Sequence, residues 1–237
     1  MDSILAKNDL EALFNLSGSQ VTKSPISELI EYKDQKNIFY IKKYHQAGKY
    51  LRKYVGRSRL KAEYENLNTF RKLGIPIPNV VNFQEKRNLT KYEKGILITE
   101  KLENVYSLAD LTVSNKKMFD NKKWFDSIII QLAAYTKTLH DNNFIHNDLK
   151  WRNILVTLDT NDPKVYFIDC PCGSIKFGPF LSRGKIKDLA CLDKVAKYVL
   201  DNKIRLKFYK QYLGVDKLTK KDKKNIIKIL KFFENRE

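Results

Sequence analysis

The pattern of apolar and polar positions divides this chain into a strand-rich first part and a helix-rich second part. In the first part, aromatic and β-branched residues in segments 27–32 and 38–41 flank a polar turn, which predicts a β-hairpin. Segments 80–83 and 95–99 predict two further strands. A short helix is expected within residues 1–16, where leucines recur at helical spacing.

Stripes of apolar residues at three- and four-residue steps predict the helices. The first runs over residues 57–73 and is ended by Gly74, since Pro76 and Pro78 prevent its continuation. A longer helix is predicted by one stripe: Trp124, Ile128, Leu132, Tyr135 and Leu139. Segments 154–156 and 165–168 predict two short strands, and the pattern beyond residue 186 is helical.

This segregation of strands and helices predicts an α+β fold with two lobes. We expect a strand-rich N-lobe over residues 1–101 and a helical C-lobe over residues 102–237. The change in periodicity places the hinge between them within residues 100–107.

The segment between the predicted long helix and the strand 154–156 carries the chemistry. From Phe144 to Asn153 it reads F-I-H-N-D-L-K-W-R-N, which resembles the catalytic loop H-x-D-x-x-x-x-N of protein kinases. The next predicted strand ends in Asp169, where that family has its metal-binding aspartate. The resemblance implies that the α+β fold is protein-kinase-like.

Phosphoryl transfer depends on positioning and on neutralising charge around the transferred phosphate, which explains the spacing of this segment. Asp148 is the predicted catalytic base, which orients the attacking hydroxyl, and Lys150 is placed to reach the phosphate. Asn153 and Asp169 offer the hard oxygen ligands that Mg²⁺ requires. His146 is expected to brace the loop against the Asp169 segment.

The N-lobe is expected to supply a lysine that contacts the phosphates of ATP. Residues 39–42 fit the kinase pattern V-A-I-K, which makes Lys42 the candidate, because its neighbour Lys43 points to the other face of the strand. The acidic partner should lie on the following helix, where Glu63 is preferred over Glu65.

Adenine binding is assigned to the end of the strand 95–99, where Glu100 and Leu102 would offer backbone groups to the base. Two features depart from protein kinases. No G-x-G-x-x-G precedes Lys42, so the phosphate loop is unassigned, and C-P rather than F-G follows Asp169. With no A-P-E motif and with Asn147 in place of the kinase arginine, a phosphorylation-switched activation loop is not expected.

Composition adds information about partners and compartment. The formal charge is +18, with eight basic and no acidic residues in segment 42–61 and twelve basic against four acidic residues in segment 203–237. Such an excess indicates an anionic partner, or else a solvated basic face. Three cysteines cannot all pair, which indicates reduced thiols. No secretory signal and no apolar run of about 20 residues is present, so no membrane span is expected.

Further segments are similar to the bacterial lipopolysaccharide kinase family, the inner-core Kdo and heptose kinases. They are N-I-F-Y-I-K-K-Y from Asn37, the basic run that follows, A-E-Y-E-N-L from Ala62, L-G-I-P-I-P from Leu73 and K-D-L from Lys187. The resemblance implies an ATP- and Mg²⁺-dependent kinase on the cytoplasmic face of the inner membrane. It implies that the acceptor is a sugar hydroxyl of the lipopolysaccharide core.

The charge agrees with an anionic glycolipid acceptor and an anionic membrane surface, and no nucleic-acid partner is expected. The apolar stripe of Ile226, Ile229, Leu230 and Phe233 within a lysine-rich helix fits either packing on the C-lobe or lying on a membrane. Two alternative functions remain, an atypical Ser/Thr protein kinase, favoured by Lys150, and another small-molecule kinase of the same fold. A pseudokinase is disfavoured because Lys42, Asp148, Asn153 and Asp169 are all present.

Overall fold

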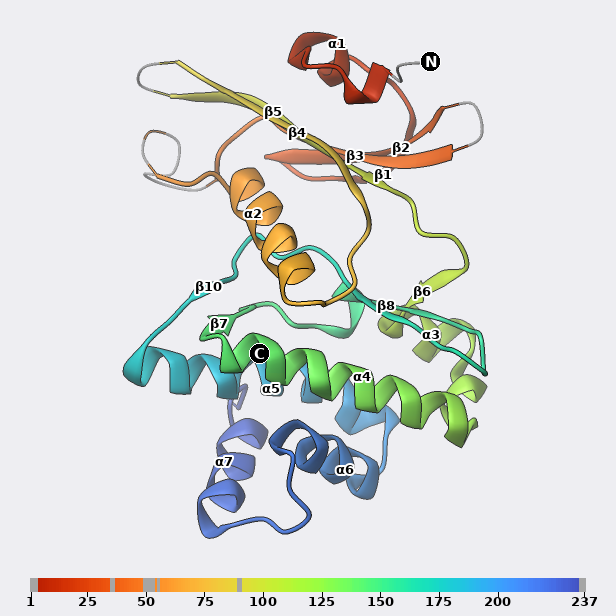
Figure 1. Ribbon diagram of the computed structural model, residues 1–237, viewed down its shortest axis with the longest axis vertical. Helices are drawn as coiled ribbons and strands as arrows, with labels where there is room; N and C mark the ends of the chain where they lie inside the picture. The colour runs from red at the N-terminus through yellow and green to blue at the C-terminus, as the bar shows by residue number, and fades with distance from the viewer. Residues whose placement is uncertain (1–3, 35–36, 49–53, 55, 89–90, 235–237) are drawn as a thin grey trace. The chain divides into compact units, whose positions relative to one another are not determined.

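The structure is a computed structural model that describes residues 4–34, 37–48, 54, 56–88 and 91–234. It divides into two compact units, the first of residues 1–68 and 77–103 and the second of residues 69–76 and 104–237. The predicted lobe boundary at residue 101 differs from this division by two residues, and segment 69–76 groups with the helical unit. Figure 1 labels the helices and strands.

The first unit is built on one five-stranded antiparallel sheet with the order β1-β2-β3-β5-β4. The predicted hairpin is confirmed, because β2 pairs with β3 and Tyr32 lies opposite Phe39. The predicted helix 57–73 is confirmed as α2. The elements are η1 (Ile4–Ala6), α1 (Leu10–Phe14), β1 (Ser19–Lys23), β2 (Ser27–Asp34), β3 (Asn37–Tyr44), α2 (Arg59–Lys72), β4 (Val80–Arg87) and β5 (Tyr92–Glu100).

Alternation along the strands gives this sheet two buried faces. Ile41, Ile96 and Ile98 join Leu5 and Leu13 in one apolar core, so η1 and α1 cover that face. The next residue positions point the other way. There Gly95 lies so close to α2 that an added Cβ would come within 2.6 Å of Leu60 Cδ2. The two faces are visible in Figure 1, with α1 and α2 on opposite sides of the strands.

The second unit is mainly helical and carries two small antiparallel sheets, β6-β8-β9 and β7-β10. The predicted long helix is α4, and its stripe is buried at Trp124, Ile128, Leu132 and Leu139. The elements are β6 (Val105–Ser107), α3 (Leu108–Ser114), η3 (Lys116–Asp120), α4 (Lys122–Asp141), β7 (Phe144–Ile145), η4 (Trp151–Asn153), β8 (Ile154–Thr157), β9 (Val165–Phe167), β10 (Ser174–Ile175), α5 (Gly178–Val199), α6 (Asn202–Leu213) and α7 (Lys220–Leu230).

The C-terminal helix α7 packs on the second unit rather than presenting its apolar stripe to a membrane. Ile229 is buried in a cluster with Ala133 and Leu189, and Ile226 packs against the same cluster. The structure favours the packing alternative for this stripe, because Ile226, Ile229 and Phe233 pack on this cluster, although Leu230 is 52% exposed. No helix in the described part of the chain is long and apolar enough to cross a bilayer.

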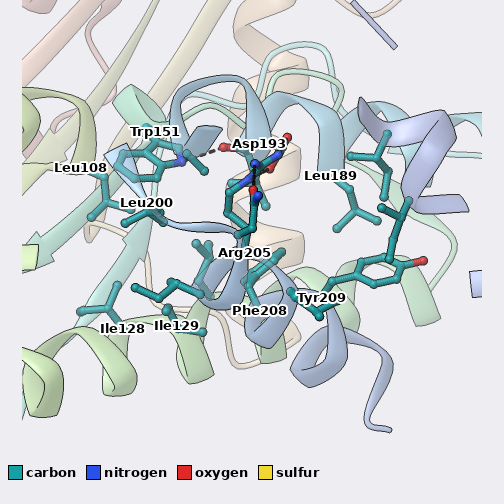
Figure 2. Close-up of a pocket in the computed structure, with 18 of the residues that line it drawn as sticks. Leu108, Ile128, Ile129, Trp151, Leu189, Asp193, Leu200, Arg205, Phe208 and Tyr209 are labelled. Atoms are coloured by element: carbon teal, nitrogen blue, oxygen red, sulfur yellow. Dashed lines mark hydrogen bonds and ion pairs between the residues drawn. The ribbon is translucent and has the colours of Figure 1, made fainter. Parts of the chain in front are cut away.

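An apolar pocket of about 350 Å³ lies among the helices of the second unit. Aliphatic and aromatic side chains from helices α3 to α7 line it, together with the indole of Trp151, and Figure 2 shows most of them. Its polar wall is an ion pair in which Arg205 donates to both carboxylate oxygens of Asp193, each at 2.7 Å. This ion pair satisfies the two charges beside a lining that is otherwise apolar.

The three cysteines are free, as their number predicts, with Cys170 and Cys191 buried and Cys172 exposed. Of the basic residues in segment 42–61, Lys49, Arg52 and Lys53 lie outside the described residues.

Helix α5 approaches β7 at Gly184, where an added Cβ would come within 2.6 to 3.0 Å of three Ile145 side-chain carbons. We expect Gly184→Ala to lower the free energy of unfolding by about 1–3 kcal/mol through overpacking, because the clash outweighs a gain of about 1 kcal/mol in helix propensity. In an Ile145→Ala background the same change should be neutral or stabilising. Urea unfolding of the four variants in this cycle measures both effects, and destabilisation in both backgrounds would show that the close approach is not the cause.

Candidate active site

The catalytic-loop segment leaves β7 and returns through η4 into β8, and its backbone turns are closed by short-range hydrogen bonds. The amide of Lys150 donates to the Asp148 carbonyl at 2.9 Å, and the amide of Asn153 donates to the Lys150 carbonyl at 2.8 Å. Trp151 is buried and its indole donates to the Leu192 carbonyl of α5 at 2.9 Å. This indole lines the pocket of Figure 2, so the loop is anchored in the helical core.

Asp148 lies at the centre of a charged cluster within this loop. Lys150 Nζ is 2.6 Å from one carboxylate oxygen, and the Arg152 guanidinium is 3.3 Å from the other. Partial burial by itself raises the pKa of Asp148, but the hydrogen bond and charge of Lys150, together with Arg152, outweigh it and hold the pKa below the ordinary aspartate value. Asp148 is therefore ionised at neutral pH and can accept a hydrogen bond from a hydroxyl.

The structure connects the two predicted metal ligands through the backbone. Asn153 is buried, and its side-chain amide nitrogen donates to the Asp148 carbonyl at 2.9 Å. The carbonyl of Asn153 accepts a hydrogen bond from the amide of Ile168, which directly precedes Asp169. Asp169 has a positive φ of 54°, a conformation that is strained for a residue with a side chain.

These residues fit a Mg²⁺ ion that also binds nucleotide phosphates. The amide nitrogen of Asn153 already donates to the backbone, which leaves Oδ1 as the atom suited to a cation. Mg²⁺ in kinases is held by one or two protein oxygens together with substrate phosphates. The described residues contain no group of three His, Cys, Asp or Glu side chains that would hold a metal unaided. The metal role of Asn153 and Asp169 stays a prediction.

His146 is fully buried beside Asp148, the predicted catalytic base. Its ring stacks on Phe70 at 5.8 Å between centroids and meets Phe167 edge-on at 6.3 Å. Burial lowers the pKa of His146 even though the surrounding aspartates favour the charged form, so the imidazole is neutral. Because Phe167 lies two residues before Asp169, this packing agrees with the predicted bracing role.

A further residue of the site, Asp188 on α5, had no predicted role. It is fully buried and accepts hydrogen bonds from the backbone amides of His146 at 2.7 Å and Asn147 at 2.8 Å. Asn147 has a φ of 67°, and its side chain donates to the Cys172 carbonyl at 3.0 Å. The sequence did carry a signal for this residue, because Asp188 lies on the apolar face of an amphipathic helix. An aspartate is rarely buried without a partner, so its position indicates a structural hydrogen-bonding role.

In the first unit, Lys42 and Glu63 form the predicted ion pair. Lys42 Nζ donates to both carboxylate oxygens of Glu63 at 2.8 and 2.9 Å, and the Glu63 side chain is only 6% exposed. Lys43 points to the other face and donates to the Leu16 carbonyl at 2.6 Å. Glu65 pairs with Arg57 at the surface, so the geometry favours Glu63 over Glu65.

The segment predicted to bind adenine continues the edge of β5. The amide of Glu100 donates to the Asn79 carbonyl at 2.9 Å, and the amide of Lys101 donates to the Ile38 carbonyl at 2.8 Å. The Glu100 amide is thus used within the first unit, and the adenine roles of Glu100 and Leu102 stay predictions.

Gly18, which directly precedes β1, permits a close approach to the backbone of β2, because an added Cβ would come within 2.2 Å of the Glu31 carbonyl oxygen.

The fold and the loop together define the class of protein. Residues 25–229 match the family described as the lipopolysaccharide kinase (Kdo/WaaP) family, so the chain belongs to it, which confirms the predicted family.

Two curated relatives carry the name 3-deoxy-D-manno-octulosonic acid kinase. The protein from Mannheimia succiniciproducens is 27% identical over 108 residues, which cover 46% of this chain and 42% of the relative. The protein from Actinobacillus succinogenes is 32% identical over 121 residues, which cover 50% and 47% of the two chains. The match therefore spans less than half the length of these relatives.

Among solved structures, the chain is similar to WaaP in complex with acyl carrier protein. The TM-score is 0.76 at 16% identity, with 95% of this chain and 90% of that chain covered. At this identity the likeness concerns the fold, and it confirms the predicted α+β, protein-kinase-like class.

We expect Lys42→Ala to weaken nucleotide use at least about tenfold more than Lys43→Ala, because a charged hydrogen-bonded pair is worth roughly 1.5–3 kcal/mol. The measurement is the KM for ATP in an ADP-release assay. Lys43→Ala is the matched control, since its side chain lies on the opposite face of the same strand. Equal losses in both variants would contradict the assignment of Lys42.

A second prediction concerns pH. Because the pKa of Asp148 is lowered, its carboxylate stays ionised as pH falls and protonates only below the usual aspartate range. Lys150→Met should raise this pKa and move the acidic limb of the kcat/KM profile to higher pH. Arg152→Met, which removes the longer and more exposed contact, should move it less. A limb that stays in place in both variants would show that Asp148 is not the titrating group.

Proposed function

We propose that this protein is an ATP-dependent kinase that phosphorylates a sugar hydroxyl, Kdo or heptose, of the lipopolysaccharide inner core. The observation that carries the proposal is the charged cluster of Asp148, Lys150 and Arg152 on a kinase-type loop, in a chain that belongs to the lipopolysaccharide kinase family. The names of the two curated relatives support a Kdo acceptor.

In this mechanism Asp148 is an ionised acceptor that orients the attacking hydroxyl. The acceptor oxygen forms a bond to the γ-phosphorus of ATP while the bond from that phosphorus to the leaving ADP oxygen breaks. The hydroxyl proton passes to the Asp148 carboxylate and then to solvent. Because phosphoryl transfer needs little covalent assistance, most of the contribution of Asp148 is positioning.

Basic residues neutralise charge during the transfer. The Lys150 side chain is 41% exposed, so its ammonium group has room to move from Asp148 to a phosphate when one is bound. Lys42, held by Glu63, is assigned to the α- and β-phosphates. When bound through Asn153 and Asp169, Mg²⁺ would supply further neutralisation of the phosphates.

The charge of the chain supports an anionic acceptor and an anionic surface. With 45 basic and 27 acidic residues, the protein favours a substrate that carries carboxylates and phosphates. The proposed location is the cytoplasmic face of the inner membrane, where each lysine near the surface would contribute about 1 kcal/mol to attraction. An atypical Ser/Thr protein kinase is the second candidate, favoured by the D-L-K sequence at Asp148–Lys150.

We expect Asp148→Asn and Asp169→Asn to reduce phosphate transfer by about 10²- to 10⁴-fold, the range for loss of a positioned acid or base. Each variant should unfold at the wild-type temperature if the fold is intact. Asp162→Asn, an exposed loop residue, is the matched control and should retain full activity. Mass spectrometry of purified core glycolipid measures the product as the gain of one phosphate.

Wild-type turnover in Asp148→Asn at saturating ATP would overturn the catalytic assignment. Phosphate on a protein acceptor, with none on the glycolipid, would retain the kinase reading and replace the acceptor.

A further inference from the structure

A run of exposed apolar side chains directly follows the metal-ligand segment in the second unit. Ile175, Phe177 and Phe180 are 58%, 69% and 75% exposed, although they lie within six residues of one another. Ile175 belongs to β10, and the two phenylalanines lie at the start of α5. Exposed aromatic side chains of this size gathered in one place indicate a surface that is covered in function.

The same segment is strongly basic. Residues 170–187 contain four basic and no acidic residues. Arg183 lies one helical turn after Phe180, so the two side chains are neighbours on α5. Lys176, Arg183 and Lys185 make no ion pair within the described part of the chain. The described part of the protein therefore does not neutralise these charges, and they lie close in sequence to the exposed apolar side chains.

Hydrogen bonds and close packing fix this segment to the catalytic loop. Ser174 and Ile175 pair with Ile145 and Phe144 of β7, and the amide of Lys176 donates to the Asn143 carbonyl at 2.8 Å. At the far end, Lys187 Nζ is 3.4 Å from Asn147 Oδ1. Ile175 pairs with Phe144, and the chain from Phe144 to Asp148 spans at most about 14 Å. A surface that covers Ile175 therefore lies near Asp148, and Phe177 and Phe180 follow Ile175 within five residues.

We propose that Ile175, Lys176, Phe177, Phe180 and Arg183 form a docking surface that inserts into an anionic phospholipid bilayer and presents Asp148 to a lipid-anchored acceptor. The role in presenting Asp148 rests on the proposed kinase function, whereas the binding to lipid does not. Aromatic side chains partition into the headgroup region, and lysine and arginine beside them pair with anionic lipid phosphates.

The charge pattern favours a bilayer over a soluble protein. The apolar side chains are 58% to 75% exposed, and the apolar pocket of this unit is lined by a different set of residues. A surface that combines protruding aromatic residues with unpaired positive charge matches the two attractions of an interfacial membrane anchor, apolar insertion and electrostatics. The stripe of α7, by contrast, is already used in packing.

Binding of the full chain to vesicles tests the docking surface without ATP or acceptor. Wild-type protein should cosediment with phosphatidylethanolamine vesicles that contain phosphatidylglycerol, and poorly with phosphatidylcholine alone. The double variant Phe177→Ser with Phe180→Ser should bind about 10- to 100-fold more weakly, since two largely exposed aromatic rings are removed. Tyr198→Ser with Ile227→Ser, at 73% and 53% exposure, is the matched control and should bind as wild type.

A double charge-reversal variant separates the electrostatic contribution to vesicle binding from the apolar contribution. Lys176→Glu with Arg183→Glu should weaken binding, and added salt should weaken the remaining binding less than it weakens the wild type. Lys223→Glu with Lys224→Glu makes the same charge change on exposed positions of α7 and should have a smaller effect. Binding by the phenylalanine variant equal to that of the wild type would overturn the proposal and favour a protein partner for this surface.

Activity on two acceptors separates this inference from the proposed function. The phenylalanine variant should lose transfer to acceptor embedded in vesicles but keep wild-type transfer to delipidated core oligosaccharide. Loss on both acceptors with unchanged thermal unfolding would show that the surface serves catalysis rather than docking. If the wild type phosphorylates neither acceptor, the kinase proposal fails, and the vesicle measurement still decides whether lipid binds here.

Discussion

The catalytic loop depends on one buried carboxylate. Asp188 lies on α5, is fully shielded from solvent, and accepts the backbone amides of His146 and Asn147 with its two oxygens. Charge-assisted hydrogen bonds of this kind are stronger than those between neutral groups, and leaving two buried amides unsatisfied would cost about 1–3 kcal/mol each. The hydrogen bonds to Asp188 also hold Asn147 in its left-handed backbone conformation, which turns the chain directly before Asp148. The loop position of Asp148, the proposed catalytic base, is therefore set from the neighbouring helix α5.

A neutral, fully buried histidine completes this arrangement by packing rather than by charge. The ring of His146 lies against Phe70 and Phe167, and burial keeps its pKa low beside several aspartates. A charged imidazole here would bring a second desolvated ion into the core. Because the ring is neutral, Asp188 need not pair with it and accepts hydrogen bonds from the backbone amides instead. The positive charge near Asp148 comes from Lys150 and Arg152, which remain in contact with solvent.

The elements with strong periodicity could be predicted from the sequence, because burial on one face imposes a repeat that is visible without coordinates. The hairpin β2–β3, helix α2 and helix α4 are of this kind, and the catalytic loop is recognisable because phosphoryl transfer fixes its spacing. Long-range contacts leave no such repeat. Asp188 is separated by more than forty residues from the amides that it binds, so no local repeat in the sequence reveals these contacts. For α7 the pattern was ambiguous in principle, because an apolar stripe flanked by lysines fits a protein core and a membrane equally well.

Only a small part of the excess positive charge lies against Asp148, the proposed catalytic base. A high local density of lysine around Asp148 would favour further ion pairs that occlude it, yet its immediate cations are Lys150 and Arg152, whose side chains are 41% and 62% exposed. The acid-free segment 170–187 carries its charges on the chain beyond β10 and on α5, a separate element that is fixed to the loop by β7 pairing and by Asn147. The second unit therefore carries the small charged cluster around Asp148, to which we assign phosphate transfer, and a separate basic segment that suits an anionic partner. Helix α5 carries both Asp188, which accepts the two loop amides, and Arg183 of the proposed docking surface, so a single helix joins that surface to the residue that positions the loop.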